Sequence, residues 1–330
     1  MRILITGGSG FIGTNAIEKF SRDGHAILNY SLHPPLDSEQ TSFWRAGDIL
    51  AGETLAAAFH EFQPDHVLHL AARTDCDENT TVEKGYRVNT VGTQNVLESI
   101  RITPSVQRAI ITSSQFVCGP GRLPRNDEDY FPETVYGQSK AITEKLTRNA
   151  NLSVCWTIIR PTNVWGPWHM RYRREFWRVV EQGRYVHPGR APVIRSYAYV
   201  KNVLYQIRQI FEMQQALVHG KTLYVGDRPI NLLDWTDGFS RALTGRPVRV
   251  IPRAFMRSLA LLGDIPTRLS GKPFLINSSR FRSMITNYAT PMEPTFELLG
   301  ENPDTLEEGI RETVKWLRTC RDFSGHGGGS

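Results

Sequence analysis

The chain has 330 residues, of which 40% are hydrophobic and 22% charged, with a formal net charge of +6 at pH 7. This composition is typical of a globular protein, and it excludes a collagen-like or long disordered chain. Its apolar runs fall short of the roughly 18 residues that span a bilayer, and four scattered cysteines without a CxxC pair favour neither zinc nor disulfides. We therefore expect a cytoplasmic protein with no metal site and no membrane span.

The first half of the chain alternates predicted strands with predicted helices. Short β-rich runs stand at 2–6, 26–30, 66–71, 108–113 and 154–160. Helical periodicity fills about 11–22, 81–102 and 134–149. Strands that alternate with helices in this way indicate a parallel sheet covered on both faces. The predicted fold class is therefore α/β, with a Rossmann-type doubly wound sheet.

The pattern changes after about Gly166. Predicted helices at 172–182, 200–213, 232–243 and 306–317 are separated by Pro- and Gly-containing connections. We expect a dinucleotide-binding domain over 1–166 and a smaller mixed C-terminal lobe over 167–323. That lobe would mainly bind substrate, with room for segments that return to the first domain, and 324–330 would form a flexible tail. The apolar run 254–265 is expected to pack within the C-terminal lobe rather than bind lipid.

A glycine-rich segment joins the first predicted strand to the first predicted helix. Gly7, Gly10 and Gly13 fit GxxGxxG, and Gly8 completes a GxGxxG. Glycine is needed here because the chain turns sharply, approaches a pyrophosphate closely and packs the helix tightly on the strand. The phosphates would then lie at the positive end of the helix. Dinucleotide binding is the prediction.

The residues after the second predicted strand do not choose between NAD and NADP. An acidic residue there would hold the ribose hydroxyls of NAD, but the chain has Asn29, Tyr30 and Ser31 and no carboxylate before Asp37. No arginine stands there to bind the 2′-phosphate of NADP. Both cofactors stay open.

A candidate acid–base pair follows downstream. Tyr136 and Lys140 are four residues apart at the start of a predicted helix, so they share one face. A neighbouring ammonium favours phenolate and would lower the tyrosine pKa from about 10, which suits proton exchange with a hydroxyl or carbonyl. The strand that ends in Ser113 and Ser114 supplies a hydroxyl at the carboxyl end of the sheet, where open α/β folds bind ligands. We predict Ser114, Tyr136 and Lys140 as the catalytic residues.

From Met1 to about Leu317 the chain resembles the extended short-chain dehydrogenases/reductases, in particular their nucleotide-sugar epimerase/dehydratase branch. The similar segments are TGGSGFIG (6–13), GDI (47–49), HLAA (69–72), VNTVGTQNVL (88–97), SSQFVCG (113–119), YGQSK (136–140), RPTNVWGP (160–167), RSYAYVKNV (195–203) and LGENPDTLEEGIRETVKWL (299–317). The resemblance implies a cofactor site made by Gly7, Gly10, Phe11, Ile12, Gly13, Asp48, Ile49, Leu70, Ala71, Ala72, Asn89, Tyr136, Lys140 and Pro161. It implies a substrate site that includes Ser114, Gln115, Asn163 and Arg195, with Arg195 pairing with a substrate diphosphate. A homodimer, with 81–102 and 134–149 at its interface, is a further expectation of the resemblance.

The chain also departs from that pattern. The 4,6-dehydratases of the branch carry Asp-Glu directly after the catalytic Ser/Thr, and the 3,5-epimerase/reductases carry a cysteine two positions after it. Here Gln115 and Phe116 follow Ser114, so neither chemistry is expected. A nucleotide-sugar 4-epimerase or 4-keto-sugar reductase is the favoured function. A reductase of a sterol- or flavonoid-like substrate is the enzymatic alternative, and a non-catalytic dinucleotide sensor the remote one.

Arginines gather between positions 171 and 195, and three readings explain them. They could bind nucleic acid, bind a smaller anion such as a sugar-nucleotide diphosphate, or form a solvated helix face. The intact catalytic set argues against a nucleic-acid partner, so the expected partner is a nucleotide-sugar substrate.

Overall fold

The computed structural model describes residues 1–270 and 276–324 and divides the chain into two compact units. The first unit comprises Met1–Trp168, Ala198–Asp227 and Thr290–Asp304. The second comprises His169–Tyr197, Arg228–Ala289 and the chain from Thr305 onward. After Trp168 the chain therefore returns to the first unit twice. Of the tail predicted over 324–330, residues 325–330 lie outside the described part of the chain.

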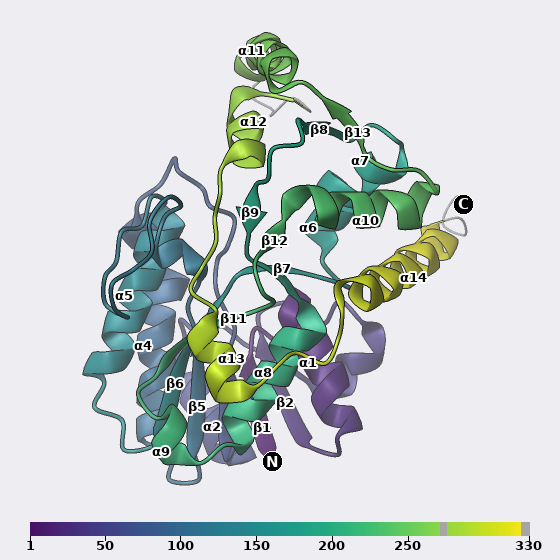
Figure 1. Ribbon diagram of the computed structural model, residues 1–330. Helices are drawn as coiled ribbons and strands as arrows, with labels where there is room; N and C mark the ends of the chain where they lie inside the picture. The colour runs from purple at the N-terminus through teal and green to yellow at the C-terminus, as the bar shows by residue number, and fades with distance from the viewer. Residues whose placement is uncertain (271–275, 325–330) are drawn as a thin grey trace. The chain divides into compact units, whose positions relative to one another are not determined.

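The first unit is built on a seven-stranded parallel sheet (Figure 1). Its strands are β1 (Arg2–Thr6), β2 (Ala26–Ser31), β3 (Trp44–Ala46), β4 (His66–His69), β5 (Arg108–Thr112), β6 (Cys155–Pro161) and β11 (Thr222–Val225). They lie in the order β11-β6-β5-β4-β1-β2-β3, and all neighbours run parallel. The order reverses direction between β1 and β4, as in a doubly wound sheet. The predicted fold class is confirmed.

Helices cover both faces of this sheet because successive strand residues point to opposite sides. On β1, Ile3 and Ile5 belong to one buried cluster and Leu4 to another. The first cluster includes residues of α1 (Phe11–Arg22), α8 (Val200–Glu212) and α13 (Glu293–Leu299). The second includes residues of α2 (Gly52–Phe62) and α4 (Arg87–Arg101), with α5 (Val135–Asn149) packed beside it. The sheet is therefore buried on both sides, which is why its strands are almost continuously apolar.

The helix predicted over 81–102 is interrupted. It forms as α3 (Val82–Gly85) and α4, and the residue between them, Tyr86, has φ −120° and ψ 27°. The carbonyl of Gly85 accepts a hydrogen bond of 3.0 Å from the Arg73 guanidinium, and the Tyr86 hydroxyl donates to Asp75 at 3.2 Å. The Gly85 carbonyl thus bonds to Arg73 rather than to the next turn of a helix, and the prediction of one unbroken helix was wrong.

Several further elements were not predicted from the sequence, most of them because they are too short to carry a period. They are the strands β3 and β11, the helices α2, α9 (Gln215–Val218) and α13, the 3-10 turns at Ser38–Phe43 and Gln115–Val117, and the paired strands β7 (Asn163–Trp165) and β10 (Tyr197–Tyr199). The start of α8 is fixed by Asn202, which donates hydrogen bonds to Asp227 and to the carbonyl of Asp304 at 2.8 and 2.9 Å. Asn202 therefore joins the second and third chain segments of the first unit.

The second unit is mixed and mostly helical. Its elements are α6 (Met170–Tyr172), a π-helical turn (Arg173–Trp177), α7 (Arg178–Glu181), β8 (Val186–Pro188), β9 (Ile194–Arg195), β12 (Ile230–Asn231), α10 (Leu232–Thr244), β13 (Arg249–Ile251), α11 (Arg253–Ser270), α12 (Ser278–Ile285) and α14 (Leu306–Ser324). Its core is aromatic: the Trp235 ring stacks on Tyr197 at 4.4 Å and on Phe176 at 4.8 Å. In the described part of the chain, no helix is both long and apolar enough to cross a membrane.

Candidate active site

The predicted site residues of the first unit gather at one edge of the sheet. Because β6, β5, β4 and β1 are parallel neighbours, their carboxyl ends lie side by side. The glycine loop follows β1, residues 70–72 follow β4, Ser114 follows β5, and Pro161 is the last residue of β6. Parallel strands thus bring together segments more than 150 residues apart in sequence, at the place where doubly wound sheets bind ligands.

The glycine loop has the shape that a pyrophosphate site needs. Gly7 has φ +73°, and a Cβ built on it would lie 2.6 Å from the backbone nitrogen of Ala71. A Cβ on Gly13 would lie 2.4 Å from the Gly8 Cα, so the helix packs directly on the loop. A Cβ on Gly10, in contrast, would meet only the Gly7 oxygen within 4 Å among the described residues. The loop is therefore closed toward the protein and open at Gly10, the residue that precedes α1.

Helix α1 begins at this opening. Its N-cap residue Gly10 offers no side chain to cap the helix, and no acidic residue lies in the first turn. Phe11 and Ile12 are the first two residues of this 12-residue helix. An anion at this position would meet helix N–H groups and the positive end of the helix dipole. The loop therefore fits the phosphates of a dinucleotide.

The end of β2 braces the loop. The Ser31 hydroxyl accepts a hydrogen bond of 3.2 Å from the Ser9 N–H and donates one of 2.6 Å to Asn29. The Asn29 amide in turn donates to the Ser9 hydroxyl at 3.1 Å. Because all three residues bond to one another, the end of β2 and the glycine loop are held as one piece. The sequence analysis noted Asn29 and Ser31 only as standing where a ribose-binding carboxylate is absent, and it missed this bracing role.

The remaining cofactor candidates of the first unit lie around this edge. Asp48 accepts the N–H of Leu50 at 2.9 Å, and Ile49 is buried. Leu70 and Ala71 are tied to the end of β1 through the carbonyl and hydroxyl of Thr6, and Ala72 follows them, half-buried. Their contacts with a dinucleotide stay a prediction.

Asn89 is fully buried on α4 and holds two other parts of the site. Its amide donates to the Arg73 carbonyl at 3.0 Å and to the Ser139 hydroxyl at 2.9 Å, and its carbonyl oxygen accepts the Arg73 N–H at 2.8 Å. Ser139 precedes Lys140 on α5. Asn89 therefore fixes the catalytic helix against the chain that follows β4.

The catalytic candidates meet at the start of α5. Tyr136 and Lys140 lie on this helix, whose N-cap is the side chain of Thr134, and both are buried. Ser114 begins the turn after β5 and forms a side-chain hydrogen bond with Tyr136. The Lys140 ammonium donates to the carbonyl of Thr112, the last residue of β5, at 2.8 Å. The Tyr136 phenol thus meets the Ser114 hydroxyl, and the Lys140 ammonium is held by the end of the strand that leads to Ser114.

The protonation of this pair differs from the prediction. Burial raises the pKa of Tyr136 above its ordinary value, and the hydrogen bond with Ser114 only partly opposes this rise. Burial also lowers the pKa of Lys140 to about 8, against the charge of Glu144. The expected lowering of the tyrosine pKa is therefore not found in the chain by itself, because desolvation is the largest effect on Tyr136 and raises its pKa. Without cofactor and substrate, burial therefore favours the protonated phenol, and Tyr136 must ionise before it can accept a proton.

A buried ion pair supports the catalytic helix, and the sequence analysis missed it. Glu144, one turn after Lys140, accepts hydrogen bonds of 2.8 Å from both Nε and Nη2 of Arg160 on β6, and neither side chain is more than 1% exposed. Glu144 also accepts the Ser113 hydroxyl at 2.6 Å. Burial would lower the pKa of Arg160, but the hydrogen bonds and charge of Glu144 raise it. A carboxylate four residues after Lys140, and an arginine inside an apolar strand, were the available signals.

His69, at the end of β4, has no acid–base role at neutral pH. Its ring nitrogens are hydrogen-bonded with the hydroxyls of Thr6 at 2.7 Å and Thr93 at 3.1 Å. Burial lowers its pKa to about 3, so the ring is neutral. It holds β1 and α4 together.

The substrate candidates are divided between the units. Gln115 is buried directly after Ser114, and the Phe116 ring meets the Tyr136 ring edge-on at 5.9 Å. Asn163 is half-buried in β7 of the first unit. Arg195 lies in β9 of the second unit, where its guanidinium donates to the carbonyls of Thr286 (3.3 Å) and Ser283. Their roles toward a substrate stay predictions.

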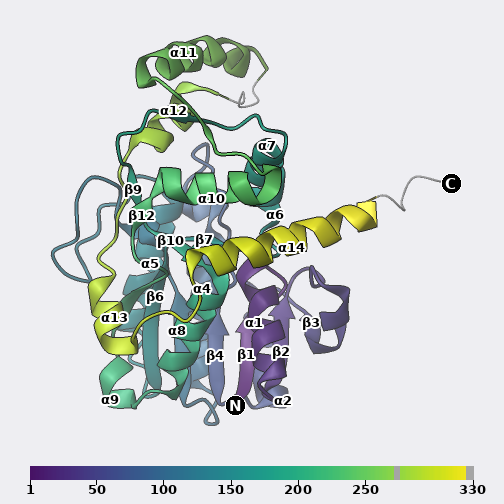
Figure 2. The ribbon, with the colours of Figure 1, turned by 45° about the vertical axis from the view of Figure 1, so that its right-hand side comes forward.

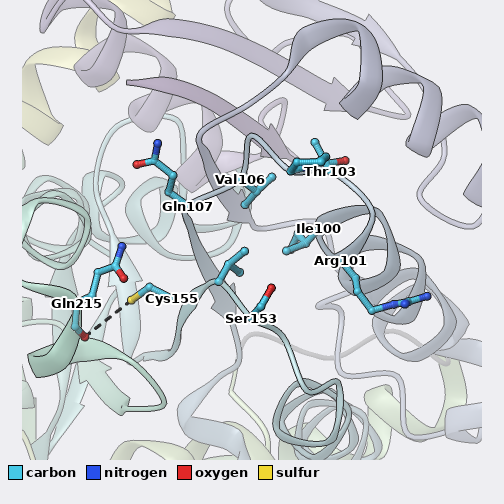
Figure 3. A pocket seen from close by; sticks show the side chains of 10 residues that line it. Ile100, Arg101, Thr103, Val106, Gln107, Ser153, Cys155 and Gln215 are labelled. Carbon is cyan, nitrogen blue, oxygen red and sulfur yellow. Dashed lines mark hydrogen bonds between the residues drawn. The ribbon is translucent and has the colours of Figure 1, made fainter.

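A cavity of about 340 Å³ lies in the first unit away from these residues (Figure 3). It is lined by residues of α4, of α9 and of the chain before β5 and β6, including Cys155, whose thiol lies 3.9 Å from the Gln215 carbonyl. It therefore adjoins the amino ends of those strands, whereas Ser114 and Pro161 lie at the carboxyl ends. No group of three metal-binding side chains was found in the described part of the chain.

The parallel sheet, the glycine loop and the Ser/Tyr/Lys set define a nicotinamide-dependent enzyme of the short-chain dehydrogenase/reductase type. Comparison with protein families identifies the particular family. Residues 3–226 match the NAD dependent epimerase/dehydratase family, and the chain belongs to this family. The recognition of the extended short-chain type and the prediction of a nicotinamide cofactor are confirmed.

Individual relatives differ in what they act on. The chain is 28% identical over 251 residues to a 3-beta-hydroxysteroid dehydrogenase of Mycolicibacterium neoaurum, covering 71% of this chain and 68% of the relative. It is 26% identical over 332 residues to an N-acetyl-alpha-D-glucosaminyl-diphospho-ditrans,octacis-undecaprenol 4-epimerase of Escherichia coli O157:H7, covering 95% and 94%. Among solved structures, a UDP-glucose 4-epimerase of Thermotoga maritima matches with a TM-score of 0.75 at 21% identity, covering 97% of this chain and all of the other.

Proposed function

We propose that this enzyme is a 4-epimerase of a sugar carried on a diphosphate, with a nucleotide sugar as the first substrate to test. The observation that carries the proposal is the set of Ser114, Tyr136 and Lys140 followed by Gln115 and Phe116. Neither of these last two side chains can act as an acid or base, so the site is equipped for proton exchange at one oxygen and not for elimination of water. The match to the E. coli 4-epimerase supports this choice, because at 26% identity it covers 95% of this chain and 94% of that enzyme.

Tyr136 moves the proton in both halves of the reaction. It takes the proton of the C4 hydroxyl as the C4 hydrogen leaves as hydride. It later returns the proton to the C4 carbonyl oxygen as the C4–H bond re-forms on the other face of the sugar. Ser114 shares a hydrogen bond with Tyr136 and orients the same oxygen. Lys140, charged below about pH 8, stabilises negative charge on the phenol. The chemistry that a nicotinamide bound at the glycine loop supplies is reversible hydride transfer.

A second candidate is oxidation of a hydroxysteroid. The match to the M. neoaurum dehydrogenase favours it, because the same Tyr/Lys pair would accept a proton from a sterol hydroxyl. The two reactions differ in the fate of the hydride. An epimerase returns it to the sugar, whereas a dehydrogenase leaves it on the cofactor as NADH.

One experiment separates these functions. The purified enzyme is incubated with NAD and UDP-glucose or UDP-N-acetylglucosamine deuterated at C4, and in parallel with a 3β-hydroxysteroid. We expect the C4 epimer with its deuterium retained and no net absorbance of NADH. Steady NADH formation with the steroid and no epimer would contradict the proposal. In a third incubation, with NADPH and a UDP-4-keto sugar, consumption of NADPH without any epimerase activity would identify a reductase instead.

The role of Tyr136 has its own test. Tyr136→Phe removes the hydroxyl and keeps the ring that packs against Phe116. We expect turnover to fall by about 10²–10⁴ while NAD affinity, measured by calorimetry, stays within about twofold. Unchanged turnover would refute the mechanism.

Arg195 is proposed to pair with the diphosphate. Arg195→Ala should weaken UDP-sugar binding by about tenfold or more and leave NAD binding unchanged. Arg190→Ala, an exposed arginine of the same unit, is the matched control and should change neither. Equal losses of sugar nucleotide and NAD would remove Arg195 from the substrate site.

A further inference from the structure

Helix α11 of the second unit leaves an apolar face uncovered. Phe255, Leu261, Leu262 and Ile265 are each between 57% and 63% exposed. In the described part of the chain, these are four of the ten large hydrophobic side chains that are exposed, and they fall within one helix. Exposed apolar side chains gathered in this way mark a binding surface. The expectation that this segment packs within its lobe was therefore only half right.

The exposed side chains form one stripe. At 100° per residue, they span an arc of about 120° around the helix, and the exposed Ala254 and Ser258 lie within it. Met256, Ala260 and Gly263 lie on the opposite side and are buried. Helix α12 packs beside α11 within this unit (Figure 2). The helix is thus anchored by one side and presents the other outward.

Charge around the stripe is positive. Of the four arginines among the described side chains of α11 and α12, Arg253 lies opposite the stripe and donates to the carbonyls of Pro188 and Ala191, and Asp264 is the one carboxylate there. Asp264 accepts hydrogen bonds from the N–H and hydroxyl of Ser278 at 2.9 and 2.6 Å, which engage both of its oxygens. Arg257, next to the stripe on α11, and Arg282 on α12 are exposed. An apolar stripe beside cations is the pattern of a helix that lies in the surface of an anionic bilayer.

We propose that α11 docks this enzyme on an anionic lipid surface, with the stripe in the acyl boundary and Arg257 and Arg282 at the lipid phosphates. A second copy of the chain fits the face less well, because a two-fold contact through the stripe would bring the same cations together, and the described residues of the stripe include no carboxylate to pair them. The proposal concerns association with the surface and no membrane crossing. It does not rest on the proposed reaction, so the two can fail separately.

Vesicle sedimentation with the full-length enzyme tests this. Vesicles of phosphatidylcholine alone are compared with vesicles that contain roughly a third phosphatidylglycerol, at low and high salt. We expect binding to the anionic vesicles that weakens as salt screens the arginines. Failure of the wild-type enzyme to bind either vesicle would overturn the proposal.

Matched variants assign the binding to the helix. Leu261→Gln/Leu262→Gln should lower the partition coefficient by about tenfold or more, because two leucines lose contact with lipid. Leu123→Gln/Leu217→Gln, which changes two leucines exposed elsewhere, should stay within about twofold of wild type. Arg257→Gln/Arg282→Gln should weaken binding to anionic vesicles only. Wild-type affinity for vesicles in the Leu261/Leu262 variant would refute the assignment. The assignment would also fail if the enzyme self-associates and this variant loses self-association but still binds vesicles.

Discussion

The buried pair of Glu144 and Arg160 offers the sharpest test of how this fold supports its site. Glu144→Gln keeps the shape of the side chain and replaces one oxygen by an amide nitrogen. In the structure, Oε1 accepts from Ser113 and from Arg160 Nε, and Oε2 accepts from Tyr130, Arg148 and Arg160 Nη2. Whichever oxygen is replaced, an N–H of the Arg160 guanidinium then faces an amide N–H. Arg160, only 1% exposed, cannot reach water instead.

The expected cost follows from this geometry. Removing one partner of a buried ion pair leaves an uncompensated charge, which destabilises a fold by about 3–5 kcal/mol. The free energy of unfolding, from urea titrations followed by circular dichroism, should fall by that amount. The control Glu98→Gln, in an exposed pair with Arg101 on α4, should be indistinguishable from wild type.

A double variant separates the charge from the packing. Glu144→Gln/Arg160→Met removes both charges, so it should be more stable than Glu144→Gln alone. If Glu144→Gln costs no more than Glu98→Gln, the buried pair is not the support that the structure indicates.

Two further predictions concern the site directly. Gly7→Ala should weaken NAD binding by more than about tenfold in calorimetry, because φ is +73° and the new Cβ would lie 2.6 Å from the Ala71 nitrogen. The control Gly24→Ala, at φ +81° with open space around it, should leave the NAD affinity unchanged. The lowered pKa of Lys140, about 8, predicts that kcat/KM falls as pH rises through that value, because the ammonium loses its proton there. Because the charge of Glu144 raises the pKa of Lys140, Glu144→Gln should shift this fall in kcat/KM to lower pH. A wild-type kcat/KM that stays flat up to pH 10 would contradict both predictions for Lys140.

Much of the first unit could be predicted because its strands and helices have strong, distinct periods. The strand 108–113 is apolar on both faces, and the helix 134–149 is amphipathic, so each was recognised from its own residues. The strands β3 and β11 were missed for the opposite reason. They are three and four residues long, and their place in the sheet is set by pairing with β2 and β6. Such edge strands carry no period of their own.

The residues of the candidate site also differ in how well the sequence predicts them. Gly7, Tyr136 and Lys140 could be found because their chemistry restricts residue type and spacing within one local segment. The contacts of Asn89 could not, and only the resemblance to the family placed Asn89 in the site. Asn89 reaches Arg73 and Ser139, which are 16 and 50 residues away, and nothing in its own segment distinguishes this from a helix-surface asparagine.

The protonation of the tyrosine–lysine pair shows why spacing alone is an incomplete guide to chemistry. Spacing of i, i+4 correctly placed Tyr136 and Lys140 on one buried helix face, and it suggested that the cation would favour phenolate. Burial acts on both groups in the opposite sense, because it disfavours each charged form. Glu144, one turn further on, is the nearby charge that keeps Lys140 protonated near neutral pH, and Arg160 is the charge that makes a buried Glu144 tolerable. A chain of buried charges therefore reaches from Lys140 on α5 to Arg160 on β6. If Tyr136 and Lys140 act as proposed, substitutions at Arg160 should alter the pH dependence of the reaction without contact with substrate.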